Sequence, residues 1–158
     1  GYAILDRIVR AFVERTLEPS LGDQSRSPLE RIYRLLDRVL ESQRQCNCVG
    51  GCPMGNLASE LSDVHEGFRQ RLAEVFTLWR ERVSRALGEA QARGELAARA
   101  EPRKVAQFIV AALEGAILMA KVTKEIDVME QCVAELKAYL ALNTVAQPAS
   151  AYPHGVRG

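Results

Sequence analysis

The sequence carries almost no excess of charge, because 21 Lys and Arg residues stand against 20 Asp and Glu residues and leave a net charge of +1. A domain that binds nucleic acid by itself usually gathers Lys and Arg on one face, since release of counterions from the phosphates drives the binding. Arg31, Arg34 and Arg38 share one helix face, but acidic residues are interleaved with them. We predict a solvated face there and no DNA contact from this chain itself.

Catalytic motifs are also missing from the sequence. His65 and His154 are its only histidines, and it has no Ser-His-acid set, phosphate-binding loop or HExxH motif. We therefore predict that the chain is not an enzyme, and we expect no cofactor.

The sequence has no uninterrupted apolar run of the length that a membrane requires. The most apolar stretch, residues 105–122, contains Gln107, Glu114 and Lys121 and is a poor match to the ~20 apolar residues of a membrane-spanning helix. The N-terminus lacks the basic start, apolar middle and small-residue cleavage site of an export signal. We expect a cytoplasmic protein with no membrane partner.

No segment alternates apolar and polar residues with period two, so strands are not expected. The 158 residues, of which 47% are hydrophobic and 26% charged, suit a single globular domain. Apolar residues instead recur at spacings of three and four between prolines and capping residues. We predict an all-α fold with helices over residues 3–17, from 28 to about 45, 53–61, from about 64 to Gly94, from Pro102 to about 122, and 126–142.

Capping patterns set the start of two of these helices. Ser27 and Glu30 flank Pro28 with the spacing of a capping box, which predicts a helix from Pro28. Asp63 and Glu66 repeat the same spacing ahead of the longest amphipathic run. At the other end of the first helix, Pro19 and Gly22 predict a break after Leu17.

This order of helices comes together with four distinctive groups of residues. They are Gly51–Leu61 (GCPMGNLASEL), the pair Phe76 and Trp79, Ala90–Leu96 (AQARGEL) and Ala112–Lys121 (ALEGAILMAK). With the helix order, they resemble the C-terminal ligand-binding and dimerisation domain of TetR/AcrR family transcriptional regulators. The resemblance is good over residues 51–121, whereas residues 1–43 match in helix order only.

The resemblance implies a ligand-responsive regulator, which we predict to be a repressor, with an unknown small-molecule effector. It also implies that operator DNA is bound by a helix-turn-helix domain preceding Gly1. Residues 1–17 would then be the linker helix, residues 18–142 the ligand-binding and dimerisation core, and residues 143–158 a tail. The alternatives are a cysteine-based redox or metal sensor on the same scaffold and a helical interaction module without DNA binding.

A homodimer is the expected assembly, since the resemblance implies that the last two helices of two subunits form a four-helix bundle. The sequence supports this independently, because a helix that is apolar on nearly every side must be covered by two surfaces. Small residues permit close helix approach, and the alternative is packing within one subunit. We predict a dimer interface of Ala112, Gly115, Ala116, Ala120, Leu136, Tyr139 and Leu140.

The resemblance also implies a ligand cavity inside each subunit. Large apolar residues on the corresponding helix faces are its predicted lining, although an aromatic stripe is also typical of an ordinary core. They are Met54, Leu57, Phe68, Leu72, Phe76, Trp79, Phe108 and Met119. Glu114, the one acidic residue of its helix, is either an effector contact or a group at a solvent-reaching edge or across the dimer.

Three cysteines, Cys46, Cys48 and Cys52, lie close together in the sequence, with His65 thirteen residues further on and Cys132 far away. Three thiols and one imidazole could bind zinc, but the spacing is not a common zinc pattern, so we predict no metal. A thiol switch is the other functional hypothesis, because cysteines near a helix N-terminus can have a lowered pKa. Unreactive reduced thiols remain the leading interpretation.

Overall fold

The computed structural model describes residues 1–146 and contains only helices among them, which confirms the all-α prediction. One isolated bridge between Leu96 and Thr144 is the sole β-type pairing of these residues. The elements are α1 (Tyr2–Phe12), a π-helical turn (Val13–Leu17), α2 (Glu18–Leu21), α3 (Pro28–Gln45), α4 (Pro53–Leu61), α5 (Glu66–Ala92), α6 (Pro102–Thr123) and α7 (Ile126–Leu142). The predicted tail lies outside the described residues from position 147 onward.

Prolines and caps begin the helices at the predicted positions. The Ser27 hydroxyl accepts from the Glu30 amide at 3.2 Å, and the Glu30 carboxylate accepts from the Ser27 amide at 3.1 Å, so the capping box is complete. Pro53 and Pro102 occupy the first turns of α4 and α6, where a missing N–H costs nothing. After α5 the chain turns at Gly94, whose φ of +75° favours glycine.

The predicted break before Pro19 is wrong, because the helix continues through Pro19 to Leu21. Proline has no N–H and its ring presses on the carbonyl four residues earlier, which here belongs to Arg15. The chain adapts by widening into the π-helical turn, in which the Glu18 amide donates to Val13 five residues back. Arg38 satisfies the freed Arg15 carbonyl, donating from Nε at 3.0 Å and from Nη2 at 2.6 Å.

The predicted cap of α5 is also wrong, since His65 and not Asp63 occupies that position. The His65 imidazole accepts from the Phe68 amide through Nδ1 at 3.3 Å, and the helix starts at Glu66. Asp63 lies in the turn that ends α4, which is closed by a hydrogen bond from the His65 amide to the Leu61 carbonyl. The chain therefore enters α5 two residues later than the capping-box spacing indicates.

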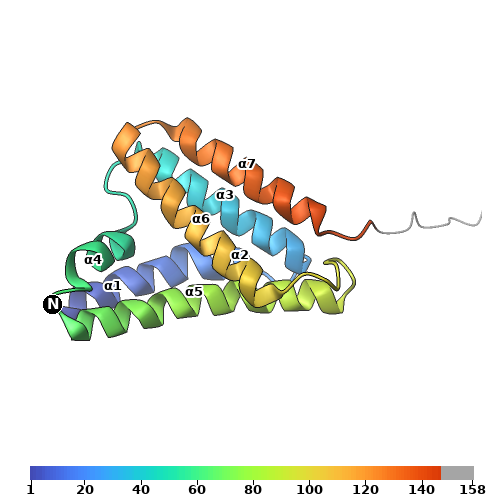
Figure 1. Cartoon of the computed structure of the whole chain (residues 1–158), viewed down its shortest axis with the longest axis horizontal. Helices are drawn as coiled ribbons and strands as arrows, with labels where there is room; N and C mark the ends of the chain where they lie inside the picture. Colours follow the sequence, from blue (N-terminus) through green and yellow to red (C-terminus); the bar gives the residue numbers. More distant parts are fainter. Residues whose placement is uncertain (147–158) are drawn as a thin grey trace, which may run out of the picture.

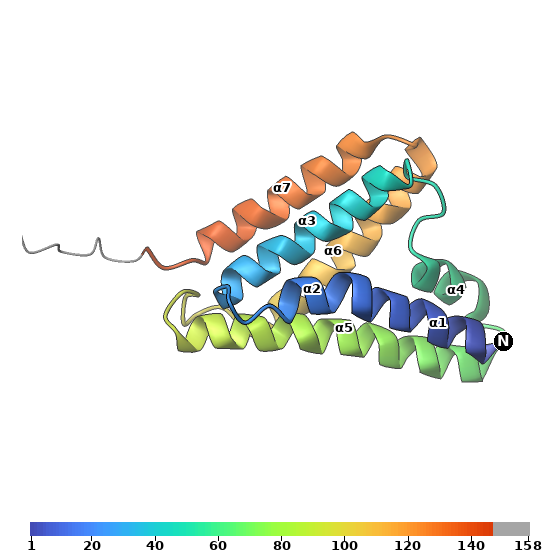
Figure 2. The ribbon, with the colours of Figure 1, turned by 180° about the vertical axis from the view of Figure 1, so that it is seen from behind.

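The helices form two groups that cross each other. In one group α1 and α2 run alongside the long helix α5 in the same direction, and in the other α3, α6 and α7 form a slanted bundle, with α7 furthest from α5 (Figures 1 and 2). The short helix α4 and the N-terminus lie at the end where α5 begins. The end of α7 and the α5–α6 loop lie toward the opposite end (Figure 1).

Two hydrophobic clusters hold this arrangement together. The large core cluster joins α2, α3, α5, α6 and α7 and includes fully buried residues such as Ile32, Val83 and Leu113. The small cluster contains only four buried residues, Leu5, Met54, Leu72 and Val75, and joins α1, α4 and the first half of α5. The end of the molecule that carries α1 and α4 is therefore held by far less buried apolar surface.

Helix α6 meets the length and composition of a membrane-spanning helix, with 44% of its most apolar window buried inside the protein. One face of α6 packs into the core through Ile109, Leu113 and Ile117. The opposite face leaves Phe108 and Leu118 exposed. Its apolar composition thus divides between a core face and an uncovered outer face.

Candidate functional site

A cavity of about 340 Å³ lies between α1 and the other helices of its end of the molecule. We call it the inner cavity. Five helices, α1, α3, α4, α5 and α6, and the π-helical turn contribute to its walls. The lining residues are Ile8, Ala11, Phe12, Arg15, Thr16, Val39, Ser42, Gln43, Gly51, Cys52, Pro53, Met54, Trp79, Glu114 and Ile117.

The side of the inner cavity that α1 forms extends into the π-helical turn that follows this helix. Ile8, Ala11 and Phe12 lie on α1, while Arg15 and Thr16 lie on the π-helical turn that follows. Such turns are frequent at functional sites, because the wider turn breaks the regular hydrogen-bond ladder. Part of this wall is therefore formed by an irregular helical segment.

Trp79 of α5 lines the inner cavity. Its side chain is only 1% exposed, and its ring packs edge-on against Phe12 with the centroids 5.0 Å apart. The indole N–H is buried and has no hydrogen-bond partner among residues 1–146. A buried donor of this kind is costly to leave unpaired.

A second cavity, of about 450 Å³, lies beside the inner cavity and is bounded by α4, α5 and α6. We call it the outer cavity, because Ala111, Gly115 and Leu118 of its lining are exposed on the outer face of α6. The remaining lining residues are Cys52, Gly55, Asn56, Ser59, Phe76, Arg80, Gln107, Val110, Glu114 and Ile117.

Cys52, Glu114 and Ile117 line both cavities and form the wall between them. Burial raises the pKa of the Glu114 carboxyl, and its Oε1 atom has no hydrogen-bond partner among residues 1–146. Gly55 makes this position possible, since a Cβ there would lie 2.5 Å from Oε2 of Glu114. Glu114 is thus a half-buried acid between the two cavities, with one carboxyl oxygen that has no hydrogen-bond partner in the described part of the chain.

The cysteines do not form a common site. Burial and the neighbouring Glu114 carboxyl raise the pKa of the Cys52 thiol to about 12, which disfavours the thiolate that a reactive cysteine needs. Cys48 is 1% exposed, and Cys46 donates to the Gln43 carbonyl at 3.4 Å. No group of three potential metal ligands converges in the described part of the chain. Nothing here favours the thiol-switch or metal-sensor alternatives.

The predicted ligand residues are placed in three different environments. Met54 and Trp79 line the inner cavity, and Phe76 lines the outer cavity. Leu57, Phe68 and Leu72 pack in the small cluster without lining either cavity. Phe108 and Met119 lie on the outer face of α6, where they are 48% and 56% exposed, and they line neither cavity.

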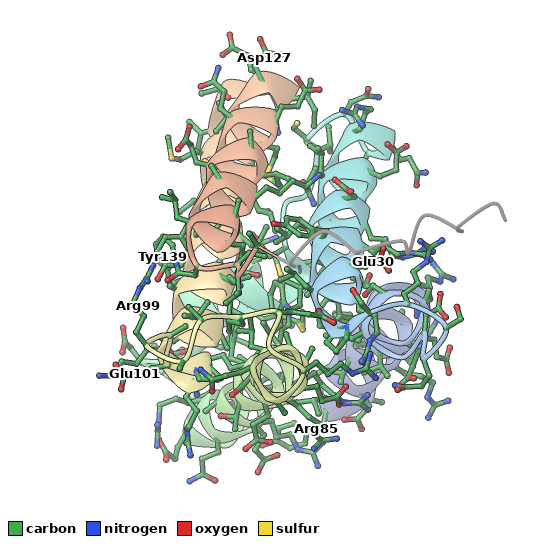
Figure 3. All side chains as sticks on the ribbon, turned by 90° about the vertical axis from the view of Figure 1, so that its right-hand side faces the viewer. Glu30, Arg85, Arg99, Glu101, Asp127 and Tyr139 are labelled. Carbon is green, nitrogen blue, oxygen red and sulfur yellow. The ribbon has the colours of Figure 1, made fainter. Side chains whose placement is uncertain are left out.

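The predicted dimer residues divide in a similar way. Gly115 and Tyr139 are exposed and Ala112 is half-buried, whereas Ala116, Ala120, Leu136 and Leu140 are buried in the large core cluster and cannot contact a partner. Figure 3 shows Tyr139 on the side formed by α6 and α7, away from Glu30 on α3. The exposed apolar residues of this α6–α7 outer face are Phe108, Leu118, Met119, Val122, Tyr139 and Leu142.

Sequence reasoning missed the contribution of α1 and the polar residues of the outer cavity. The apolar stripe of the first helix, with Ile8, Ala11 and Phe12, was the available signal for the inner cavity. Arg80 and Asn56 of the outer cavity gave no such signal, because polar residues on amphipathic helices are usually solvated.

Similarity to known proteins agrees with this architecture. The chain is 35% identical over 121 residues to the transcriptional regulator AcuR of Cereibacter sphaeroides, a match covering 77% of this chain and 55% of that protein. It is 30% identical over 128 residues to an HTH-type transcriptional regulator in the lacX 3' region of Lactococcus lactis, covering 81% of this chain and 63% of the relative. The chain thus spans somewhat more than half the length of these curated relatives.

A solved structure and a family model support the same grouping. The crystal structure of the regulatory protein TetR from Rhodobacter sphaeroides superposes with a TM-score of 0.80 at 29% identity, covering 90% of this chain and 73% of that one. Residues 28–136 match the family model described as tetracyclin repressor-like, C-terminal domain. The chain belongs to this family of TetR-type C-terminal domains.

Proposed function

We propose that this chain is the effector-binding and dimerisation part of a ligand-responsive transcriptional repressor. The observation that carries the proposal is that α1 forms one wall of the inner cavity, so a molecule in the cavity contacts the first helix of the domain directly. The relatives support a regulatory role, since AcuR and the Lactococcus protein are both named as transcriptional regulators. We place the whole regulator in the cytoplasm, where its DNA target lies.

Helix α1 would transmit the signal to a helix-turn-helix domain that precedes it, consistent with the name of the HTH-type relative. A ligand shifts a conformational equilibrium only if it binds the two states with different affinity. An inner cavity that changes shape when α1 moves supplies that difference. Filling it favours one position of α1 and thereby one spacing of two DNA-reading domains.

The effector contacts that this geometry supports are fewer than the sequence suggested. Met54 and Trp79, together with Ile8, Ala11 and Phe12 of α1, surround the inner cavity. The unpaired indole N–H of Trp79 and the Glu114 carboxyl offer hydrogen bonds to a ligand. We propose a molecule that is mainly apolar with at least one hydrogen-bonding group.

The α6–α7 outer face is the proposed dimer interface. It exposes Leu118 at 60% and Val122 at 75%, and Phe108 packs edge-on against Tyr139 with ring centroids 5.1 Å apart. Neighbouring large apolar side chains of this kind mark an interaction surface. Two such faces would form the four-helix bundle of a homodimer.

The dimer is tested by light scattering at micromolar concentration on Leu118→Glu. A charge buried in the interface would shift the protein from dimer to monomer. Val64→Glu is the matched control, because Val64 is 77% exposed in the turn between α4 and α5, and we expect it to remain dimeric. A monomeric wild-type protein would contradict this assignment.

The regulatory role is tested in the full-length regulator with Ala11→Leu, which places a larger side chain in the inner cavity from α1. The control is Ala3→Leu, the same change at an exposed position of the same helix. DNA binding is measured by fluorescence anisotropy on fragments that the wild-type protein selects from genomic DNA. We expect Ala11→Leu to mimic a bound effector and weaken DNA binding about tenfold or more, which is about 1.4 kcal/mol.

The control variant should bind DNA like the wild type. DNA binding that is unchanged in both variants would contradict the proposal that occupation of the inner cavity acts through α1. Absence of DNA binding by the full-length wild-type protein would favour the helical interaction module instead.

A further inference from the structure

Arg80 provides the only permanent charge among the residues that line the outer cavity. Its guanidinium is half-buried and donates from Nε to the Phe76 carbonyl at 3.4 Å, from Nη2 to the Thr77 hydroxyl at 3.1 Å, and from Nη1 to the Gln107 amide oxygen. All three acceptors are uncharged. No ion pair formed among residues 1–146 includes Arg80. A guanidinium in this situation is suited to an anionic partner.

The rest of the outer cavity does not supply that partner. Glu114 is the only carboxyl in the lining, and burial raises its pKa, which favours its uncharged form. A second cation lies close by, since Lys121 donates to the Asn56 side-chain oxygen at 2.9 Å, and Asn56 lines the cavity. Lys121 also forms no ion pair among the described residues. The charge balance of the outer cavity is therefore positive.

Apolar residues make up another part of the lining of the outer cavity. Phe76 and Val110 lie beside Arg80 and Gln107 in the lining, and Ile117 and Leu118 continue the apolar surface along α6. A volume of about 450 Å³ is within the range of small-molecule sites. A ligand that matches both features has an anionic group and a short hydrocarbon part.

We infer that the outer cavity binds an organic anion whose carboxylate or phosphate oxygens pair with Arg80, while its hydrocarbon part packs against Phe76 and Val110. The inference goes beyond the proposed function, because the outer cavity is a second site whose lining includes no residue of α1. Arg80 is the counterion that sets this preference for a negative charge. Gln107 holds the guanidinium in place from the neighbouring helix.

Calorimetric titration of the full-length regulator with three probes of similar size tests the inference. Hexanoate and hexyl phosphate carry the anionic group, whereas hexanamide keeps the hydrocarbon part without the charge. We expect at least one anion to bind about tenfold or more tightly than hexanamide, and the stronger anion distinguishes a carboxylate ligand from a phosphate ligand. Equal affinity for all three probes, or no binding of either anion at millimolar concentration, would overturn the inference.

Variants of Arg80 test whether the preference for an anion depends on this side chain. Arg80→Gln should weaken binding of the preferred anion about ten- to a hundredfold, the range expected for a charge-assisted hydrogen bond, and leave hexanamide binding unchanged. Arg80→Lys keeps the charge and should retain part of the preference. Arg82→Gln is the matched control, since Arg82 pairs with Glu18 at 2.9 Å and lines neither cavity. If Arg80→Gln does not fold, Arg80→Lys carries the test: a reduced anion preference would support the role of Arg80, and a preference equal to that of the wild type would count against it.

The anion site and the regulatory role can fail separately. An Arg80-dependent anion affinity together with unchanged DNA binding in Ala11→Leu would support the site and contradict the regulatory proposal. A DNA response of Ala11→Leu without any preference for an anion would do the reverse.

Discussion

The two hydrophobic clusters differ in size and in what lies beside them. The large core cluster joins α2, α3, α5, α6 and α7 and includes 26 buried residues, whereas the small cluster has four and is the main attachment of α1 and α4. Both cavities lie where the two clusters meet, since Cys52 and Phe76 of the cavity walls pack against both clusters. Regions with little buried apolar surface open more easily than the rest of a fold. The comparison thus separates a firmly packed bundle from an end of the molecule that can respond to a ligand.

The largest effect is expected in the bundle. Ile109 of α6 is fully buried in the large core cluster, so Ile109→Ala should lower the free energy of unfolding by about 2–5 kcal/mol. Urea denaturation followed by circular dichroism measures this change. Ile4→Ala, the same substitution at a position 62% exposed on α1, should change it by no more than about 0.5 kcal/mol. Similar losses in the two variants would contradict the assignment of the core.

A smaller and more local loss of stability is expected in the small cluster. Leu5 is 1% exposed but packs in the small cluster, so Leu5→Ala should cost about 2 kcal/mol, near the lower end of the usual range. We expect amide hydrogen exchange to accelerate at least tenfold in α1 while α6 stays protected. Equal acceleration in both helices would mean that the two regions unfold as one unit.

The wall between the cavities should respond to pH. Glu114 binds its proton more tightly in the folded chain than in the unfolded chain, where its pKa is near 4.5. Its contribution to stability is therefore present below that pH and is lost as the pH rises toward the raised folded value. Cys52, with a pKa of about 12, stays protonated throughout.

Glu114→Gln removes this titration. Urea denaturation between pH 4.5 and pH 8 measures the free energy of unfolding of this variant and of the wild type. We expect the variant to gain stability relative to the wild type as the pH rises. The gain should be smaller than the loss caused by Ile109→Ala or Leu5→Ala. Glu60→Gln on α4 is the control at an exposed position. If the difference in unfolding free energy between the wild type and Glu114→Gln is constant over this pH range, Glu114 titrates as an ordinary solvated acid.

The smallest effect is expected at the π-helical turn. Arg38→Ala removes the two donors that satisfy the Arg15 carbonyl beside Pro19, which should cost about 0.5–1.5 kcal/mol. Thermal unfolding measures the loss, and hydrogen exchange should rise in residues 13–21. Arg93→Ala, at the exposed C-cap of α5, should have no measurable effect. An unchanged melting temperature in Arg38→Ala would mean that water replaces the guanidinium without loss.

Much of the fold could be predicted from local chemistry. Pro28, Pro53 and Pro102 each begin a helix, and the ends of α4 and α7 fall at the predicted residues, because caps and prolines act on their nearest neighbours. The prediction at Pro19 is wrong because Arg38 satisfies the freed carbonyl of Arg15, which lies 23 residues before it in the sequence. Long-range compensation of this kind leaves no local pattern.

The candidate site was harder to predict because α6 is apolar on nearly every side. A helix without a polar face does not indicate which side joins the core, so Phe108 and Met119 were assigned to the cavity and Ala116 and Ala120 to the dimer. The structure buries Ala116 and Ala120 in the large core cluster and leaves Phe108 and Met119 exposed. Met54, Phe76 and Trp79 were placed beside a cavity through family resemblance and not through spacing.

The central claim is that a ligand acts through α1 from the inner cavity. Hydrogen exchange on the full-length regulator, with and without a compound that releases its DNA, tests this most directly. We expect the compound to protect amides of residues 8–16 in α1 and the π-helical turn, together with α4 and the middle of α5 and α6, while α7 changes little. Release of the DNA with protection elsewhere and no change in residues 8–16 would contradict the claim.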